Sequence, residues 1–417
     1  MLVGVKLKYY IVFRRMEKIT RTEMKNTGIF LTPMCHVEKL VNRSLYFIKR
    51  INITVTHVLE PSFGLGHMFQ VLNDKFYNVQ MHGVELNKHL YNSAVKDLML
   101  TNENKLTLLH KDFLKYKPSH TFDFIIGNPP YFMIKKTMID SKYHKYFDRQ
   151  PNIYVVFILK CLELLKDGGL LSFIVPINFT NCSSYKNVRT FIYTKFKICD
   201  IVHMSAGQYS TTCQDTCSLI IYKPPNHHAI THDNKKFTMS FGNNVILNSP
   251  GNIKLLNTLC KNTTNLKQLD MTVHVGTIKK SQNKDMFTNK STGYLLIDTC
   301  DTTLNIKKKN AEKLSQVTNR PLVVVSRGFG HVKYNFRYKH MSRMSHKFVI
   351  GNNLLYIQTR DARISKASQK HKISMITKSF KDKRTNEFID LYLLNYSMNC
   401  NDLLNILPIY NVNNRRK

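Results

Sequence analysis

The stretch FDFIIGNPPYF, residues 122–132, runs from an apolar segment straight into an asparagine, two prolines and a tyrosine. Each proline fixes its own φ and pushes the residue before it into an extended conformation, so Asn128 is held rigidly. The side-chain oxygen of Asn128 and the carbonyl of Pro129 can accept both hydrogens of one amino group. Tyr131 can stack against the face of a planar ring. These residue types suit an amine conjugated to a ring, such as adenine N6.

Such an amine is a poor nucleophile because its lone pair is delocalised into the ring. Two acceptors aimed at its hydrogens favour the pyramidal geometry and the positive charge that develop when the nitrogen attacks a sulfonium methyl group. An amide is not a strong base, so we expect Asn128 to act by positioning and electrostatics, with the proton lost later. The competing interpretation is an ordinary loop with two prolines.

Acidic and glycine residues upstream predict a pocket for a nucleoside. Glu60 precedes a turn that contains Gly64 and Gly66, where the backbone can approach a ligand closely. Glu85 follows 21 residues after Gly64, a distance at which a carboxylate commonly accepts hydrogen bonds from ribose hydroxyls. Asp112 could accept from an adenine amino group, and Phe113 could stack on its ring.

Each of these residues also has a simpler interpretation, because an acid at the end of a strand is often a turn residue or a helix cap. The turn lacks the third glycine of the dinucleotide-binding pattern, and the chain contains no phosphate-binding GxxxxGK sequence. Three such acids in succession, without a pyrophosphate clamp, favour S-adenosylmethionine over NAD.

Alternating strand and helix patterns between about residues 52 and 225 must position these side chains. Strands that alternate with helices predict an α/β fold with a mostly parallel, doubly wound sheet. In such sheets, ligands bind beyond the carboxyl ends of the strands, where the residues above lie. We expect the apolar helix beginning near residue 152 to end at Asp167, Gly168 and Gly169. The strands are expected at residues 55–61, 79–86, 106–114, 122–127 and 170–176, with a closing antiparallel pair at 200–204 and 217–223.

The pattern changes in the polar, proline- and histidine-containing stretch at residues 223–236, which is typical of a domain junction. We therefore expect one domain over residues 1–238 and a separate α+β domain over residues 239–417. The chain has a formal net charge of +35, and the excess is densest in the second domain. A charge of this size attracts polyanions, so nucleic acid is the leading partner, although a generally basic surface would give the same count.

The remaining composition indicates an intracellular protein without a membrane span. No apolar run approaches the roughly 18 residues that a bilayer span requires, and the N-terminal stretch does not fit a signal peptide. The nine cysteines are scattered, which argues for a reducing compartment. Cys213 and Cys217 lie close together but lack a second pair of metal ligands, so we predict no metal site.

The sequence resembles the gamma group of adenine-N6 DNA methyltransferases of restriction-modification systems. The motifs follow the order found in that family and cover roughly the first 225 residues. The matching segments are GIFLTP (28–33), VLEPSFGLG (58–66), GVELN (83–87), KDFL (111–114), DFIIGNPPY (123–131) and LLSFIVPINF (170–179).

The resemblance implies a Rossmann-like domain that binds S-adenosylmethionine, with a role for each matching residue. Thr32 and Pro33 would wall the methionine end of the cofactor. Glu85 would hold its ribose, while Asp112 and Phe113 would hold its adenine. The main cofactor loop would consist of Glu60, Pro61, Gly64 and Gly66. The target adenine, flipped out of the duplex, would be received by Asn128, Pro129, Pro130 and Tyr131, with Tyr209 as the candidate for a second stacking ring.

The resemblance also implies partners. The second domain would recognise a site in double-stranded DNA, a separately encoded restriction endonuclease is possible, and the chain is expected to be a monomer. Within residues 326–340, cations alternate with aromatic rings, which indicates either a DNA-facing strand or a strand with one basic face and one aromatic core face. Two alternatives stay open: an N-methyltransferase that acts on RNA or on a protein glutamine, and a degenerate DNA-binding module.

Overall fold

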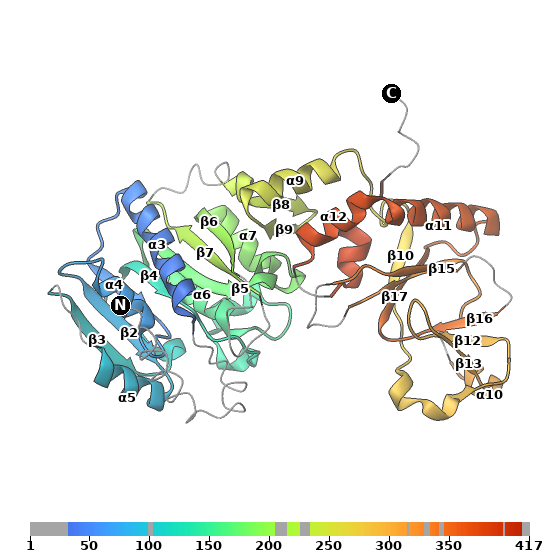
Figure 1. Cartoon of the computed structure of the whole chain (residues 1–417), viewed down its shortest axis with the longest axis horizontal. Coiled ribbons are helices and arrows are strands. Elements are labelled where there is room, and N and C mark those ends of the chain that lie inside the picture. The colour runs from blue at the N-terminus through green and yellow to red at the C-terminus, as the bar shows by residue number, and fades with distance from the viewer. Residues whose placement is uncertain are drawn as a thin grey trace, which may run out of the picture. The chain divides into compact units, whose positions relative to one another are not determined.

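The computed structural model divides into two compact units, Met1–Pro250 and Gly251–Lys417, which are described separately (Figure 1). The boundary expected after residue 238 lies earlier in the chain than the boundary between these units. The structure describes residues 32–98, 103–204, 215–225, 234–314, 317–328, 334–341, 346–394 and 397–410.

A seven-stranded sheet forms the centre of the first unit, with the strand order β3-β2-β1-β4-β5-β7-β6. The first five strands along the chain run parallel, and β7 lies antiparallel between β5 and β6. This arrangement confirms the predicted mostly parallel α/β sheet and its closing antiparallel pair. The strands are β1 (His57–Glu60), β2 (Gln80–Glu85), β3 (Lys105–His110), β4 (Phe122–Gly127), β5 (Leu165–Pro176), β6 (Lys197–Met204) and β7 (Thr216–Tyr222).

Helices cover the sheet and bury its apolar residues. Every residue of β4 is buried, which explains the unbroken apolar run that precedes Asn128. The amphipathic helix α3 buries Val37, Leu40 and Val41 in the same core as Val58 of β1. The helices of this unit are α3 (Met34–Ile51), α4 (His67–Asn73), α5 (Lys88–Asp97), α6 (Ile153–Leu164) and α7 (Lys186–Lys195).

The end of α6 differs from the prediction. The helix ends at Leu164 and β5 begins at the next residue, so Asp167, Gly168 and Gly169 belong to the strand. Gly168 has a positive φ of 85°, and its amide donates to the carbonyl of Lys223. Here the glycines shape the start of a strand that is paired on both sides, whereas the sequence pattern alone resembles a helix stop.

A hairpin of β8 (Thr238–Phe241) and β9 (Asn244–Leu247) belongs to the first unit. Arg189 of α7, which is fully buried, holds this hairpin. Its guanidinium donates to the Val245 carbonyl at 2.6 Å and to Asn244 Oδ1 at 2.6 Å. The same group donates to the carbonyls of Phe179 and Cys182. These bonds explain why the compact unit extends beyond residue 238.

The second unit contains two four-stranded sheets and several helices. One sheet has the order β10-β17-β14-β15 and the other has the order β11-β13-β12-β16. The unit therefore has the α+β composition that the sequence predicts. Its strands are β10 (Met271–Val275), β11 (Phe287–Thr288), β12 (Tyr294–Ile297), β13 (Thr303–Ile306), β14 (Leu322–Ser326), β15 (Tyr338–Met341), β16 (Lys347–Ile350) and β17 (Leu354–Thr359). Its helices are α9 (Pro250–Cys260), α10 (Lys308–Ala311), α11 (Lys366–Lys381), α12 (Lys383–Tyr392) and the π-helical turn Asp402–Ile406.

The aromatic residues around β15 pack inside this unit. The rings of Phe336 and Tyr338 lie 5.1 and 5.2 Å from the ring of Phe380 in α11. Tyr334 is buried and donates to the Ser326 carbonyl. Arg337, in contrast, is exposed and pairs with Asp301. For the described residues, the aromatic side chains thus form a core face.

Among the described residues, no helix has the length and apolar composition that crossing a bilayer demands.

Candidate active site

The carboxyl ends of three neighbouring strands bring the predicted residues together. β2, β1 and β4 are adjacent in the sheet, and they end at Glu85, Glu60 and Gly127. Asn128 directly follows β4. The sheet therefore gathers at one edge the two glutamates and the asparagine that lie far apart in the sequence.

The glycine turn after β1 is closed by the end of β2. Gly64 and Gly66 have φ values of 56° and 77°, which side chains with a Cβ rarely adopt. The Gly64 amide donates to Glu85 Oε2 at 2.9 Å, so the residues whose spacing suggested a joint site are in direct contact. A Cβ on Gly66 would lie 2.4 Å from Leu98 Cδ1, so the Leu98 side chain would have to move to admit a larger residue.

The two glutamates at these strand ends share a buried environment. Burial raises the pKa of Glu60 well above its usual value, and the nearby Glu85 carboxyl raises it further. Burial also raises the pKa of Glu85, although the amides of Asn87 and Gly64 that donate to it act in the opposite direction. Glu60 Oε2 is buried and has no hydrogen-bond partner among the described residues. A buried carboxylate oxygen without a partner is costly unless a ligand satisfies it.

The loop after β3 carries Asp112 and Phe113. Asp112 caps a short 3-10 helix, Phe113–Lys115, because its Oδ1 accepts from the Leu114 amide at 2.9 Å. The simpler interpretation of this acid, a helix cap, is therefore part of its role. The ring of Phe113 is buried, with the ring of Phe157 at 4.7 Å.

Lys160 of α6 binds the backbone of this loop, a role that the sequence did not predict. Its buried ammonium donates to the carbonyls of Phe113, Leu114 and Tyr116 at 2.6, 2.9 and 2.7 Å. Burial lowers the pKa of Lys160. The lysine lies within an otherwise apolar helical run, but the sequence does not show which groups it would bind.

Asn128 is held through both ends of its amide. Its Nδ2 donates to Thr32 Oγ1 at 2.9 Å, and its Oδ1 accepts from the hydroxyl of Tyr131. That hydroxyl also lies 3.0 Å from the carbonyl oxygen of Ile174 in β5. The hydroxyl of Ser62 lies 3.3 Å from the backbone carbonyl oxygen of Asn128. Thr32 and Tyr131 thus orient the side-chain amide of Asn128, while Ser62 contacts the backbone carbonyl of the same residue.

Aromatic rings surround the tyrosine of this motif. Tyr131 meets the ring of Tyr154 edge to face at 5.7 Å. Tyr154 is buried and also contacts the rings of Phe179 and Tyr185. Sequence reasoning did not single out Tyr154, because it lies on the buried face of an apolar helix and resembles an ordinary core residue.

The prolines and Tyr209 complete the predicted set. The carbonyl of Pro33 accepts the amides of His36 and Val37 at the start of α3, immediately after Thr32. Pro61 begins the glycine turn, and its Cδ would lie 3.3 Å from a Cβ placed on Gly127. Pro129 and Pro130 follow Asn128 as buried and half-buried residues. Tyr209 lies outside the described residues.

Comparison with known proteins finds a family match within the first unit. Residues 38–209 match the family model of the Eco57I restriction-modification methylases. Modification methylase CviBIII of Paramecium bursaria Chlorella virus NC1A is 30% identical over 215 residues, which are 51% of this chain and 54% of that protein. The chain therefore aligns with little more than half of that relative.

Two further comparisons extend into the second unit. Type II methyltransferase M.CvrRI of Paramecium bursaria Chlorella virus XZ-6E is 24% identical over 382 residues, or 90% of this chain and 92% of that protein. A DrdV–DNA complex solved by cryo-electron microscopy matches with a TM-score of 0.56 at 12% identity, over 95% of this chain and 57% of that chain. This second likeness is one of fold.

Proposed function

We propose that the chain methylates N6 of adenine in double-stranded DNA with S-adenosylmethionine, starting from the match of residues 38–209 to the family model of the Eco57I restriction-modification methylases. The observation that carries the proposal is the pair of hydrogen bonds that Thr32 and Tyr131 make with the side-chain amide of Asn128. These hydrogen bonds connect Thr32, which is expected to contact the cofactor, with the motif around Asn128, which is expected to bind the target amine.

The residues at the strand ends fit the cofactor. The buried, unpartnered Oε2 of Glu60 suits a cationic ligand, because a nearby positive charge offsets the cost of the carboxylate. Each carboxylate oxygen of Glu85 accepts a hydrogen bond from one backbone amide and can accept one more. Ribose hydroxyls would donate these additional hydrogen bonds. We assign the remaining contacts to Thr32, Pro33, Pro61, Gly64, Gly66, Asp112 and Phe113.

The cofactor supplies a methyl group on positively charged sulfur. Asn128 Oδ1 and the Pro129 carbonyl would each accept one hydrogen of the target amine and so stabilise the charge that develops on nitrogen. The amine would form a new N–C bond as the C–S bond breaks, with the electron pair left on sulfur, and the extra proton would then leave to solvent. Tyr131 would stack on the flipped base, with Pro130 shaping the loop and Tyr209 as the second ring.

We assign the second unit to DNA recognition. Its high density of Lys and Arg favours a polyanion, and the alignment with M.CvrRI continues through it. A chain of this kind would act as the modification enzyme of a restriction-modification system, as a monomer, with any cognate endonuclease encoded separately. RNA or protein-glutamine methylation and a degenerate binding module are the competing functions.

The test is methyl transfer from isotope-labelled S-adenosylmethionine to unmethylated DNA, with parallel reactions on RNA and on a release-factor protein. Nucleoside analysis of the product should find the label as N6-methyladenine in DNA. If the label appears only in RNA or only in protein, the chain is a methyltransferase that acts on that substrate and not on DNA. A folded chain that binds S-adenosylmethionine and labels no substrate would contradict the proposal and favour the degenerate module.

A further inference from the structure

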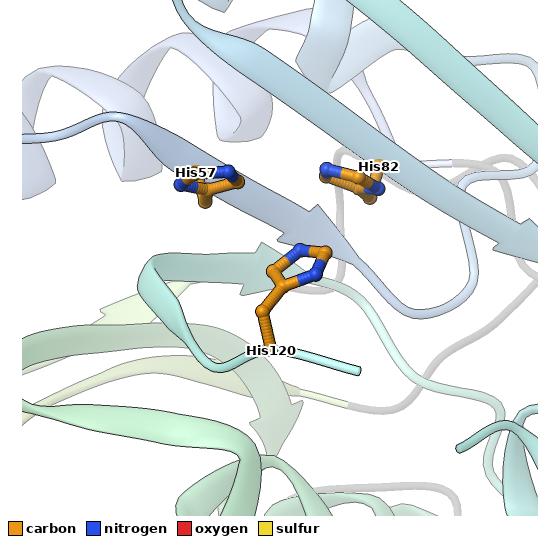
Figure 2. A group of neighbouring side chains, drawn as sticks. All are labelled: His57, His82 and His120. Carbon is orange, nitrogen blue, oxygen red and sulfur yellow. The ribbon is translucent and has the colours of Figure 1, made fainter. Parts of the chain in front are cut away.

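Three histidines from separate segments meet on one face of the central sheet. His57 begins β1, His82 lies in the neighbouring strand β2, and His120 precedes β4. One ring nitrogen of each lies within 4.8 Å of the other two. Figure 2 shows the ring of His120 pointing toward the space between His57 and His82. The ring of Phe122 packs against both His82 and His120, at 5.4 and 4.9 Å, and forms an apolar wall.

The hydrogen bonds around the cluster leave ring nitrogens available. His82 Nε2 and His120 Nε2 are buried and have no partner among the described residues. His57 Nδ1 lies 3.0 Å from Thr56 Oγ1, whose hydroxyl donates to Asp123 Oδ2 at 2.7 Å. Because a hydroxyl has one hydrogen and a carboxylate only accepts, His57 Nδ1 must be the protonated nitrogen. In the neutral ring, Nε2 therefore carries the lone pair.

We propose that His57, His82 and His120 bind one divalent transition-metal ion of the Zn²⁺ class. Neutral imidazole is a preferred ligand for Zn²⁺, Co²⁺ and Ni²⁺, whereas Mg²⁺ and Ca²⁺ prefer oxygen. Tetrahedral Zn²⁺ with bonds of about 2.0–2.1 Å places its nitrogens about 3.4 Å apart, so small side-chain rotations would close the cluster around an ion. Metal-binding histidines are commonly oriented by a hydrogen bond from their second ring nitrogen, and His57 makes such a bond to Thr56, which in turn bonds to Asp123.

The position of the site indicates a structural role. His57 and His82 each lie three residues before Glu60 and Glu85 on the same strands, and an odd separation along a strand places side chains on opposite faces. The ion would therefore bind away from the two carboxylates while joining β1, β2 and the approach to β4. These strands position the candidate active site, so metal binding should stabilise the unit that contains it. The inference does not depend on the proposed function.

Metal binding to the full-length chain tests the site directly. The chain is stripped with a chelator and titrated with Zn²⁺, and separately with Mg²⁺, by calorimetry and thermal unfolding. Because His227, His228 and His232 could also bind metal, all titrations use a chain in which these three are alanine. We expect one Zn²⁺ per chain, a higher unfolding temperature, and no effect of Mg²⁺. Absence of Zn²⁺ binding in this chain would overturn the proposal.

Two variants in the same background then identify the ligands. His120→Ala should weaken Zn²⁺ binding at least tenfold and remove the thermal shift, whereas His89→Ala, on an exposed turn of α5, should change neither. His120→Cys should restore binding and give Co²⁺ a thiolate charge-transfer absorption that the parent chain lacks. An unchanged affinity in His120→Ala, or a His120→Cys variant that binds Co²⁺ without this absorption, would exclude His120 as a ligand and overturn the three-histidine site.

Discussion

Asn128 is held by Thr32 and Tyr131, so its contribution to the reaction can be separated from cofactor binding. We expect Asn128→Ala to lower kcat by at least about 100-fold, because it removes an acceptor used in the transition state. The Kd for S-adenosylmethionine should stay within a few fold. Single-turnover methyl transfer and equilibrium binding measure the two effects, and an active Asn128→Ala enzyme would refute the mechanism.

Tyr131→Phe is the matched variant for this prediction. It keeps the ring and removes the hydroxyl that orients the Asn128 amide, so we expect a loss of about tenfold in kcat, smaller than that of Asn128→Ala.

Glu60 predicts a pH dependence of cofactor binding. Burial and the nearby Glu85 raise its pKa in the free protein, so it holds a proton at pH values where an exposed glutamate is ionised. A bound cation favours the carboxylate, so binding should release this proton, and affinity should rise with pH. Calorimetry in buffers of different ionisation enthalpy should detect the proton. Glu60→Gln should abolish its release, whereas Glu38→Gln, on the exposed face of α3, should not. Proton uptake on binding would contradict the assignment.

At the residue scale, the sequence predicts those contacts that depend on short motifs. The 21-residue spacing between Gly64 and Glu85 predicted a shared site, and the two are hydrogen bonded. The support that Lys160 gives to the loop of Phe113 was not predictable, because a lysine in a helix is usually solvated. His57, His82 and His120 form no local motif, and only the pairing of the sheet brings them together.

At the scale of elements, most strands were predicted because buried strands are apolar and end in turn residues, but β3 ends at His110, before its expected end at residue 114. β4 occupies the expected residues 122–127, and β7 differs from its expected range by one residue at each end. The junction of α6 and β5 was wrong because Gly168 and Gly169 serve a strand that is paired on both sides. Local composition does not distinguish that role from a helix stop.

Arg189 determines how α7 holds the β8–β9 hairpin. Replacing it with alanine leaves several buried carbonyl oxygens without their donor, so we expect Arg189→Ala to lower the free energy of unfolding of the first unit by at least about 3 kcal/mol. Urea denaturation measures the change. Lys195→Ala, at the exposed end of the same helix, should stay within about 0.5 kcal/mol of the parent. Equal stabilities for the two variants would show that the hairpin is held in another way.

At the scale of the whole molecule, the net charge of +35 predicts a strong salt dependence of DNA binding. The logarithm of the affinity should fall linearly with the logarithm of salt concentration, by about 0.9 per phosphate contacted. Neutralising Lys366 and Lys370 in the second unit (both to Gln) should reduce the slope by about one to two. The same change at Lys88 and Lys96 in the first unit should have less effect. Fluorescence anisotropy of labelled DNA over a salt series measures these slopes. A larger reduction for the Lys88 and Lys96 variant would indicate that DNA binds to the first unit.

The attachment of α3 has a consequence for how the chain folds during synthesis. Thr32 is separated from this helix only by Pro33, and Arg43 within the helix pairs with Asp200 of β6 at 2.5 Å. The helix that follows Thr32 is therefore linked to β6, a strand that is synthesised much later than α3. Since synthesis proceeds from the N-terminus, the packing of α3 against β1 can form early, whereas the ion pair between Arg43 and Asp200 can form only when β6 has been made. A nascent chain that ends before β6 already contains Thr32 and Asn128, yet we expect α3 to be held less firmly in it than in a chain that includes β6.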